Sequence, residues 1–464
     1  MRRLFVTTTT TTSTTTTTRV DGVKLVYPSR RRLRRRRHRI VRWTTVKVDD
    51  DDASALHLFK EKVHLVTQTF DTAPKSDTFK HLETFASPRI DGHRTRASFG
   101  VVHAPPPHRG EDEERRVGRS APALSSVRLM TTTPNGGELM DVFDARRVVR
   151  EESEGVRRGI DALLRAIACM EEEEEDNDNV APSMRAASVL SNRAATEIVV
   201  STTHDRDGFG DDDESAWRRM ATRMMAIEPA VVGVIGKRKK TSPHLVVGRG
   251  DYVFEETTTT TTTFGKRTVV FKHREGSFSN PNPDVAEQTA NYLCDVVRAL
   301  TKDGSTPTRF VELYAGCGNH SVTLAPYFSL GAYAVEINGE LVEAARENFA
   351  RNDVGHCAEI VCAPAEEWAT RRRNAEDDGS ATVLLVDPPR GGLDPKTLDF
   401  VSREFDVVIY VACDYKSLRR DMDDKFIERG FAIERLACFD HAPTSAKWIE
   451  TVAVLVRCAK TTVV

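Results

Sequence analysis

A glycine-rich turn with an acidic residue beyond it is the first group of residues that could do chemistry. Residues 312–319 read ELYAGCGN, and Gly316 and Gly318 would allow a tight turn and a close approach of the backbone to a ligand. Glu336 ends the next apolar stretch, and an acidic group about 20 residues beyond such a turn suits hydrogen bonding to ribose hydroxyls. A dinucleotide site would favour a third glycine, where this chain has Ser321. The pattern therefore favours S-adenosyl-L-methionine, which has no pyrophosphate.

An aspartate followed by two prolines and an arginine forms a second candidate group. Residues 387–394 read DPPRGGLD and follow a strongly apolar stretch, so Asp387 would stand at the end of a buried strand. The prolines stiffen the loop and fix the position of Asp387. Its carboxylate could hold a ligand or substrate, and Arg390 could pair with a phosphate or a structural carboxylate. A rigid surface turn without function is the weaker interpretation.

A cysteine at the end of the following apolar stretch is the candidate nucleophile. Residues 410–421 read YVACDYKSLRRD and contain Cys413. On its own, a cysteine at a strand end is most often a small buried apolar residue. Here it comes one strand after Asp387 and at the start of a predicted helix, whose dipole would favour a thiolate. This setting favours a reactive thiol.

Alternating helix and strand patterns from residue 284 onward would position these groups. Apolar stretches separated by helical segments predict parallel strands at 310–314, 332–336, 359–362, 382–386 and 407–411. Two final strands, near Ile433 and Val452, have no helix between them and predict an antiparallel hairpin at one edge. Asp394 and Pro395 are a favourable helix start. We expect an α/β fold, a doubly wound Rossmann-like sheet over residues 271–464 with ligands at its carboxyl edge.

Residues 55–270 predict a separate α+β domain. Strand-like stretches at 97–102, 197–201 and 231–235 alternate with helical patterns at 157–169 and 217–227. Low-complexity runs of polar residues interrupt the chain, and we interpret them as solvated surface loops; they lie at 111–114, 171–179, 211–214 and 257–263.

The charge distribution separates the N-terminus from the rest of the chain. Residues 1–48 contain 14 Lys and Arg and one acidic residue, and a Thr tract precedes the Arg run. This composition predicts that residues 1–50 are a disordered organelle transit peptide, for a chloroplast or mitochondrion. The alternative is a basic arm that binds RNA phosphates in a cytoplasmic protein. The remaining chain has 53 basic and 68 acidic residues, so any RNA contact there must use a local basic patch.

Cysteine spacing and hydropathy argue against metal sites, disulfides and membrane helices. The eight cysteines include no C-x-x-C pair and no cluster at zinc-ligand spacing, so we expect neither a metal site nor a disulfide framework. No stretch approaches the roughly 18 apolar residues that a membrane helix needs. We therefore expect a soluble protein with reduced thiols.

Taken together, these strings resemble the RNA 5-methyluridine methyltransferases, particularly the tRNA (uracil-5-)-methyltransferases. The similar segments include 312–319, VEIN at 335–338, 386–394, 410–421 and WIETVAVL at 448–455. Upstream, GSFSNPN at 276–282 and SPRIDGHRTRASF at 87–99 resemble family segments, so the similarity covers about residues 55–464. It implies a methyltransferase domain at 271–464 and an RNA-recognition domain at 55–270.

The resemblance implies roles for individual residues. Cys413 falls on the family's nucleophile and Glu450 on its general base. The resemblance places the cofactor-binding residues at Asn280, Tyr314, Asn319, Glu336 and Asp387. Asn280 stands where the family usually has Gln. The ending HAPTSAKWIE also departs from the family pattern, with Trp448 at a usual His position.

The implied chemistry is methylation of uridine C5 in tRNA. Addition of the Cys413 thiolate to C6 would make C5 nucleophilic, and Glu450 would remove the C5 proton. Arg94 and Arg96 alternate on a predicted strand and could hold phosphates, or could simply face solvent. Three alternatives are the same chemistry on ribosomal RNA, cytosine-5 methylation, and a non-catalytic RNA-binding or folding module. Ribosomal RNA enzymes often add an N-terminal barrel and four cysteines, and cytosine-5 enzymes place the cysteine beside the prolines.

Overall fold

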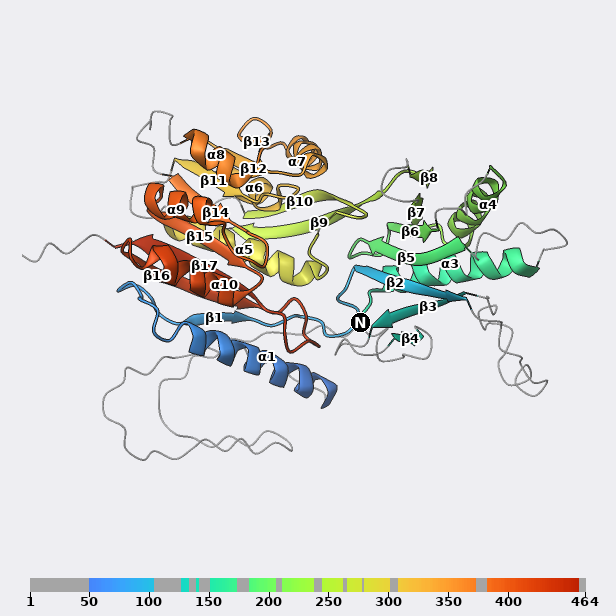
Figure 1. Cartoon of the computed structure of the whole chain (residues 1–464), viewed down its shortest axis with the longest axis horizontal. Coiled ribbons are helices and arrows are strands. Elements are labelled where there is room, and N and C mark those ends of the chain that lie inside the picture. Colours follow the sequence, from blue (N-terminus) through green and yellow to red (C-terminus); the bar gives the residue numbers. More distant parts are fainter. Residues whose placement is uncertain are drawn as a thin grey trace, which may run out of the picture.

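Two β-sheets and a long β-hairpin form the framework of the computed structural model (Figure 1). The structure describes residues 50–103, 127–132, 139–141, 151–172, 183–205, 211–237, 244–261, 265–277, 279–300, 308–372 and 382–458. The predicted transit peptide lies outside these ranges. Within them, no helix is both long and apolar enough to cross a bilayer, and no three potential metal-ligating side chains gather as a group.

The larger sheet contains the predicted parallel strands and the terminal hairpin. Its order is β1 (Leu82–Phe85), β16 (Phe431–Phe439), β17 (Glu450–Arg457), β15 (Val407–Ala412), β14 (Thr382–Val386), β11 (Arg309–Leu313), β12 (Ala332–Glu336) and β13 (Ala358–Cys362). β17 is antiparallel to both of its neighbours, and every other neighbouring pair in this sheet is parallel. The predicted doubly wound sheet and its antiparallel hairpin are confirmed, but β1 and not the hairpin forms the edge of the sheet.

Helices cover both faces of this sheet because its strands are apolar on both sides. Along β11, Val311 and Leu313 join the core on one face, and Phe310 joins the core on the other. The first face packs against α1 (Asp50–Thr69), α8 (Ala365–Arg372), α9 (Pro395–Glu404) and α10 (Tyr415–Asp421). The second packs against α5 (Pro283–Leu300), α6 (Asn319–Leu324) and α7 (Gly339–Arg351).

The smaller sheet is mostly antiparallel and lies beside the larger one in Figure 1. Its order is β4 (Leu139–Asp141), β3 (Val127–Thr132), β2 (Arg96–His103), β5 (Met184–Ser191), β6 (Ile198–His204), β7 (Val231–Lys237) and β8 (Leu245–Gly248). The helices α3 (Glu154–Glu172) and α4 (Asp211–Ile227) share one core with it, and Trp217 is fully buried there. The strand and helix patterns predicted in this region all form.

Two of the polar runs are regular structure, not loops. Thr257 to Thr261 belong to β9 (Tyr252–Thr261), which pairs with β10 (Gly265–Arg274). Thr257 and Thr259 are buried because alternate positions of the strand face inward, and the β-branched side chain suits a strand. The run 211–214 forms the first turn of α4, where acidic residues are favourable. The surface-loop interpretation was wrong for both.

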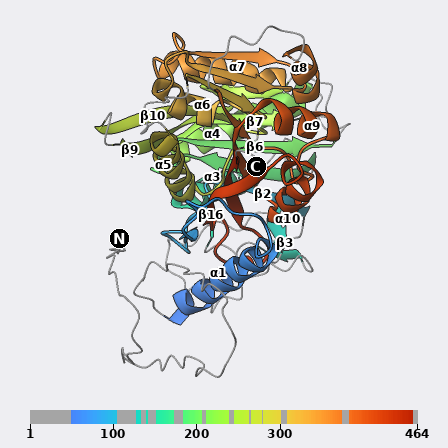
Figure 2. The same cartoon turned by 90° about the vertical axis from the view of Figure 1, so that its left-hand side faces the viewer.

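The N-terminal helix and first strand belong to the larger sheet. β1 pairs in parallel with β16, and α1 packs its Phe59, Val63 and Phe70 into the core of the first face. Figures 1 and 2 both show α1 beneath the C-terminal strands. Residues 55–85, which the sequence grouped with residues 55–270, therefore pack with the C-terminal region, because β1 covers an otherwise open sheet edge. The domain division itself stays a prediction.

Candidate active site

The glycine turn after β11 folds around the carboxylate of Glu336. Gly316 and Gly318 have φ of 56° and 79°, and a Cβ on Gly318 would lie 2.7 Å from Phe349 Cε1. Only glycine suits that combination of backbone and space. The Gly316 N–H donates to Glu336 Oε2 over 2.9 Å, and the Asn338 N–H donates to Oε1 over 2.8 Å. Glu336 thus holds the turn, and its carboxylate oxygens retain lone pairs for a ligand hydroxyl.

Ser321, at the position where a dinucleotide site would favour glycine, has a structural partner. Its N–H donates to Glu312 Oε2 over 2.9 Å, and its hydroxyl donates to the same oxygen. Glu312 is fully buried, and burial raises its pKa to about 7. This pair joins β11 to α6 and so fixes the turn between them.

A small cavity of about 100 Å³ lies at the carboxyl edge of the larger sheet. It brings together four predicted site residues, Asn280, Asn319, Asp387 and Glu450. Tyr314 and Glu336 do not line it. Glu336 holds the glycine turn, and the Tyr314 hydroxyl donates to Asp394 Oδ2 over 3.4 Å, at the N-terminus of α9.

Two histidines that sequence reasoning missed each lie beside one carboxylate of this cavity. His441 Nε2 lies 3.0 Å from Glu450 Oε1 and 3.3 Å from Asn280 Nδ2. His320 Nε2 lies 3.9 Å from Asp387 Oδ2. Burial opposes a charge on His320, but nearby carboxylates, Asp387 first, outweigh it and raise its pKa to about 9. Burial likewise opposes ionisation of Glu450, yet His441 and His320 outweigh it and lower the pKa of Glu450.

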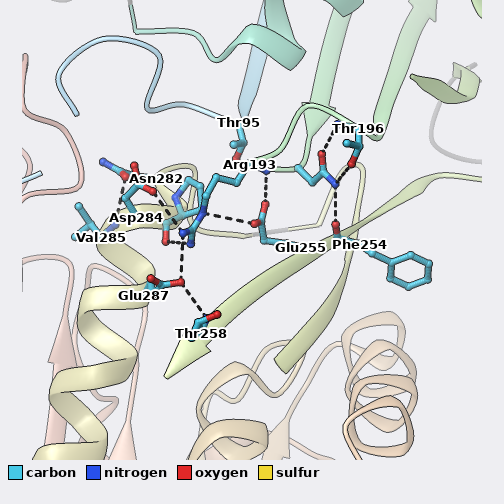
Figure 3. A network of polar contacts seen from close by, with 12 residues as sticks. Thr95, Arg193, Thr196, Phe254, Glu255, Thr258, Asn282, Asp284, Val285 and Glu287 are labelled. Atoms are coloured by element: carbon cyan, nitrogen blue, oxygen red, sulfur yellow. Dashed lines mark hydrogen bonds and ion pairs between the residues drawn. The ribbon is translucent and has the colours of Figure 1, made fainter. Parts of the chain in front are cut away.

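Arg193 contacts residues of α5 and β9 that line this cavity (Figure 3). Its guanidinium donates to Pro283 O over 2.9 Å and to Glu287 Oε2 over 3.2 Å, in the first turns of α5. Its backbone N–H donates to Glu255 Oε2, on β9, over 2.7 Å. Burial raises the pKa of Glu255 to about 7. Since Pro283 and Glu255 line the cavity, Arg193 connects the β5–β6 turn to it.

Strand pairing brings Cys413 and Glu450 to the same end of the neighbouring strands β15 and β17. The register of β15 and β17 ends with Ala412 opposite Thr451; Cys413 directly follows β15 at this end, and Glu450 is the first residue of β17. The Glu450 carboxylate is close enough to raise the pKa of the Cys413 thiol. The two residues are thus neighbours although 37 positions separate them in the sequence.

The charge around Cys413 differs from the expected thiolate environment. Burial raises the pKa of the Cys413 thiol, Asp387 and Glu450 raise it further, and Arg390 opposes them. Asp414 caps α10 by accepting the Lys416 N–H over 2.9 Å. Because burial and the two carboxylates outweigh Arg390, the expectation of a stabilised thiolate was wrong.

A second, larger cavity contains Cys413. Its volume is about 380 Å³, and its lining includes Lys62, Arg390, Lys416, Lys447 and Trp448. This lies within the range of about 300–1,000 Å³ that is typical of ligand pockets. The nucleophile candidate therefore borders one cavity and the base candidate lines the other.

A buried aspartate that sequence reasoning missed supports the DPPR loop. Asp421 Oδ2 accepts the Leu393 N–H over 2.8 Å and the Tyr410 hydroxyl over 2.7 Å. Gly392 has φ of 76°, and a Cβ there would lie 2.6 Å from Asp421 Oδ2. Asp394 caps α9, accepting the N–H groups of the second and third helical residues, as predicted.

The predicted pair of phosphate-binding arginines has other partners. The Arg96 guanidinium donates to Arg274 O over 2.9 Å and to Ser277 O. Arg94 Nη1 lies 3.5 Å from Glu151 Oε2. Arg96 therefore joins β2 to the end of β10, which differs from both the phosphate-binding and the solvent-facing interpretations.

A family model matches the part of the chain that contains the predicted catalytic and cofactor-binding residues. The family model described as tRNA (Uracil-5-)-methyltransferase matches residues 188–458, more than half of the chain. This chain belongs to the tRNA (uracil-5-)-methyltransferase family. The matched residues include β9, β10 and every strand of the larger sheet except β1.

Curated relatives of this family member are bacterial enzymes named tRNA/tmRNA (uracil-C(5))-methyltransferase. The Aromatoleum aromaticum protein is 31% identical over 256 residues, which cover 53% of this chain and 63% of that protein. The Nitratiruptor protein is 28% identical over 240 residues, covering 50% and 61%. The Neisseria meningitidis serogroup B protein is 33% identical over 224 residues, covering 46% and 57%. The chain thus spans about three fifths of the length of these relatives.

A solved structure shares the fold over most of both chains. It is the Pyrococcus abyssi tRNA (uracil-54, C5)-methyltransferase in complex with S-adenosyl-L-homocysteine. The TM-score is 0.57 at 17% identity, over 88% of this chain and 84% of that one. At this identity the likeness establishes the fold alone.

Proposed function

We propose that this chain transfers a methyl group from S-adenosyl-L-methionine to C5 of a uridine in tRNA. The observation that supports the proposal is that Cys413 and Glu450 lie at the same end of the paired strands β15 and β17, with the Asp387 and Glu450 carboxylates close enough to influence the thiol. A nucleophilic thiol beside a carboxylate base is the pair that this substitution needs.

The residues around the glycine turn fit S-adenosyl-L-methionine. A Cβ on Gly316 would meet no atom within 4 Å, so space lies open above the turn. Ile337, directly after Glu336, is 65% exposed and would offer an apolar surface to an adenine ring. Glu336 would accept ribose hydroxyls, and Asn280, Asn319 and Asp387 would hold polar groups of the same molecule. When bound, this cofactor supplies an electrophilic methyl group.

The residues of this chain would act in a fixed order. The Cys413 sulfur adds to C6 of uracil, and the electrons of the C5–C6 double bond move toward the C4 carbonyl oxygen. C5 is then nucleophilic enough to accept a methyl group. Glu450, ionised and hydrogen-bonded to His441, removes the C5 proton. The double bond forms again, the carbon–sulfur bond breaks, and the thiolate leaves. Base catalysis of this kind contributes typically 10²–10⁴-fold.

The names of the relatives support tRNA over ribosomal RNA as the substrate. We also propose that the smaller sheet with α3 and α4 recognises RNA, since it lies beside the edge that carries Cys413. Residues 1–48 are proposed to direct the chain to a chloroplast or mitochondrion. Import of a residue 1–60 fusion into isolated organelles tests that proposal, and failure of the fusion to enter either organelle contradicts it.

Methyl incorporation tests the proposed activity. The full chain is incubated with methyl-labelled cofactor and with tRNA or ribosomal RNA separately, and the product nucleosides are identified by mass spectrometry. We expect 5-methyluridine in tRNA, its loss in Cys413→Ala, and its retention in the matched control Cys458→Ala. Incorporation into ribosomal RNA alone would favour the ribosomal substrate. Incorporation into neither contradicts the proposal and favours a non-catalytic module.

A further inference from the structure

An exposed tryptophan beside the nucleophile is not used by the chemistry described so far. Trp448 is 37% exposed, although Trp217 and Trp368 are buried in cores. The Arg390 guanidinium carbon lies 3.5 Å from the centroid of the Trp448 ring, a close cation–π contact. Trp448 also lines the Cys413 cavity.

Positive side chains outnumber the one carboxylate, Asp414, among the residues that line this cavity. Arg390, Lys416 and Lys447 are all exposed and line the same cavity. Across the described ranges, none of these three cations forms an ion pair with a carboxylate. In a chain whose residues after 48 are acidic overall, such a group is the local basic patch that an RNA phosphate would need.

The backbone that carries the indole is held in place before any ligand binds. Lys62, which is 2% exposed, donates to Trp448 O over 3.2 Å and to Ala442 O over 3.0 Å. Its third contact, to Asp440 Oδ1 over 2.5 Å, anchors it to β16 and the loop that follows. A fixed aromatic surface loses little conformational entropy on binding.

The chemistry of the target ring decides which base this surface can take. Sulfur adds to C6 and the methyl group reaches C5 along directions perpendicular to the ring plane, so the faces of the target uracil must stay open. An indole stacked over that ring would compete with the reacting groups. A nucleotide next to the target has no such requirement, and its base can stack without hindrance.

We propose that Trp448, backed by Arg390, is a stacking platform for an unpaired RNA base adjacent to the target uridine. Lys416 and Lys447 hold the phosphates that flank this base. Base–aromatic stacking is tolerant of base identity, and removing one platform typically costs about 5- to 150-fold in affinity. With the adjacent base held on the indole, that base cannot stack on the target uridine again. The platform would therefore keep the target uridine extruded. This inference rests on the proposed function, because it requires RNA at Cys413.

Substitutions at Trp448 combined with an altered RNA test the platform. The substrate is the tRNA transcript that the wild-type chain methylates, and a second transcript carries an abasic nucleotide beside the target. We expect Trp448→Leu to raise KM for the intact transcript about 5- to 150-fold, and Trp448→Phe to restore most of the loss. On the abasic transcript, Trp448→Leu should have little further effect. Leu330→Ala, another exposed apolar residue, is the matched control.

The outcomes separate this inference from the proposed function. An unchanged KM in Trp448→Leu overturns the platform. So does a KM on the abasic transcript that Trp448→Leu raises by the same factor as on the intact transcript, and both results leave methyl transfer intact. A wild-type chain that methylates no RNA overturns the proposed function and the platform with it. Loss of the thermal transition in Trp448→Leu is checked against Trp448→Phe, which keeps an aromatic ring in the same position.

Discussion

Cys413 lies among charges of opposite sign, and their balance sets its reactivity. Burial and the carboxylates of Asp387 and Glu450 favour the neutral thiol, whereas Arg390 favours the thiolate. The pKa of Glu450 is lowered, so this carboxylate is ionised near neutral pH and can accept a proton. The site thus holds an ionised base beside a thiol that must lose its proton to react.

The raised pKa of Cys413 predicts an alkaline dependence of its reactivity. Because the thiolate is the reacting form, alkylation of Cys413 by iodoacetamide should keep rising above about pH 8.5, the ordinary thiol value. Arg390→Gln removes the charge that stabilises the thiolate, so the profile should move to higher pH. Arg371→Gln, exposed and distant on α8, is the control. Peptide mass spectrometry measures the rate, and an unchanged or more acidic profile in Arg390→Gln contradicts this assignment.

Single residues could be predicted from the sequence where a motif surrounds them. Cys413, Asp387 and Glu336 follow apolar strands, and the sheet brings all three to one edge. His320 and His441 had no such signal, because each acquires its role from a carboxylate on another element. The pKa direction of Cys413 also could not be predicted, since it depends on burial and on the carboxylates of Asp387 and Glu450, which other strands contribute.

At the scale of elements, α1 holds the loop between β16 and β17 in position. Lys62 is buried on α1 and contacts both ends of residues 440–448, the loop that precedes Glu450. Burial lowers the pKa of Lys62, and its partner Asp440 opposes that effect. A charge this deeply buried is tolerated only because its partners satisfy it.

Lys62→Met should destabilise the chain by about 3–5 kcal/mol, because it leaves Asp440 buried without its partner. Adding Asp440→Asn removes the remaining charge and should recover part of that loss. Urea unfolding measures the free energy, and exposed Lys60→Met on the same helix is the control. A loss in the single variant below about 1 kcal/mol, the range of a surface pair, would contradict the positioning role of Lys62.

The elements themselves were predictable where the apolar pattern is regular. The strands of the larger sheet have buried apolar runs, and the hairpin follows from two strands without a helix between them. The Thr run in β9 and the acidic run at the start of α4 could not be predicted, because low complexity hides the alternation that burial imposes. The pairing of β1 with β16 joins residues more than 300 positions apart, which local patterns cannot indicate.

At the scale of the whole molecule, Arg193 connects the two sheets. It projects from the β5–β6 turn toward the first turns of α5 and toward β9 (Figure 3). Both of these elements line the cavity that contains Asp387 and Glu450. The smaller sheet is therefore mechanically connected to the site, and its position can influence the shape of the cavity.

Arg193→Ala should weaken both stability and cofactor binding. It removes charge-assisted hydrogen bonds worth about 1.5–3 kcal/mol each and leaves Glu255 buried without its guanidinium partner. We expect a lower thermal midpoint and weaker binding of S-adenosyl-L-homocysteine by calorimetry. Arg193→Lys should recover only part of the effect, since it lacks the planar fork. Arg165→Ala, on the exposed face of α3, is the control, and equal cofactor affinity in the Arg193→Ala variant and the wild-type chain would show that the two sheets are not coupled.

The most direct test of the account is the covalent state of Cys413 when its base is removed. Glu450→Gln is incubated with tRNA and S-adenosyl-L-methionine, and the chain is then digested and analysed by mass spectrometry. Without a carboxylate to take the C5 proton, the thiolate cannot leave, so we predict a nucleotide adduct on the Cys413 peptide. The adduct should be absent in the Cys413→Ala/Glu450→Gln chain. Methyl transfer without any adduct, or an adduct on another cysteine, would contradict the account.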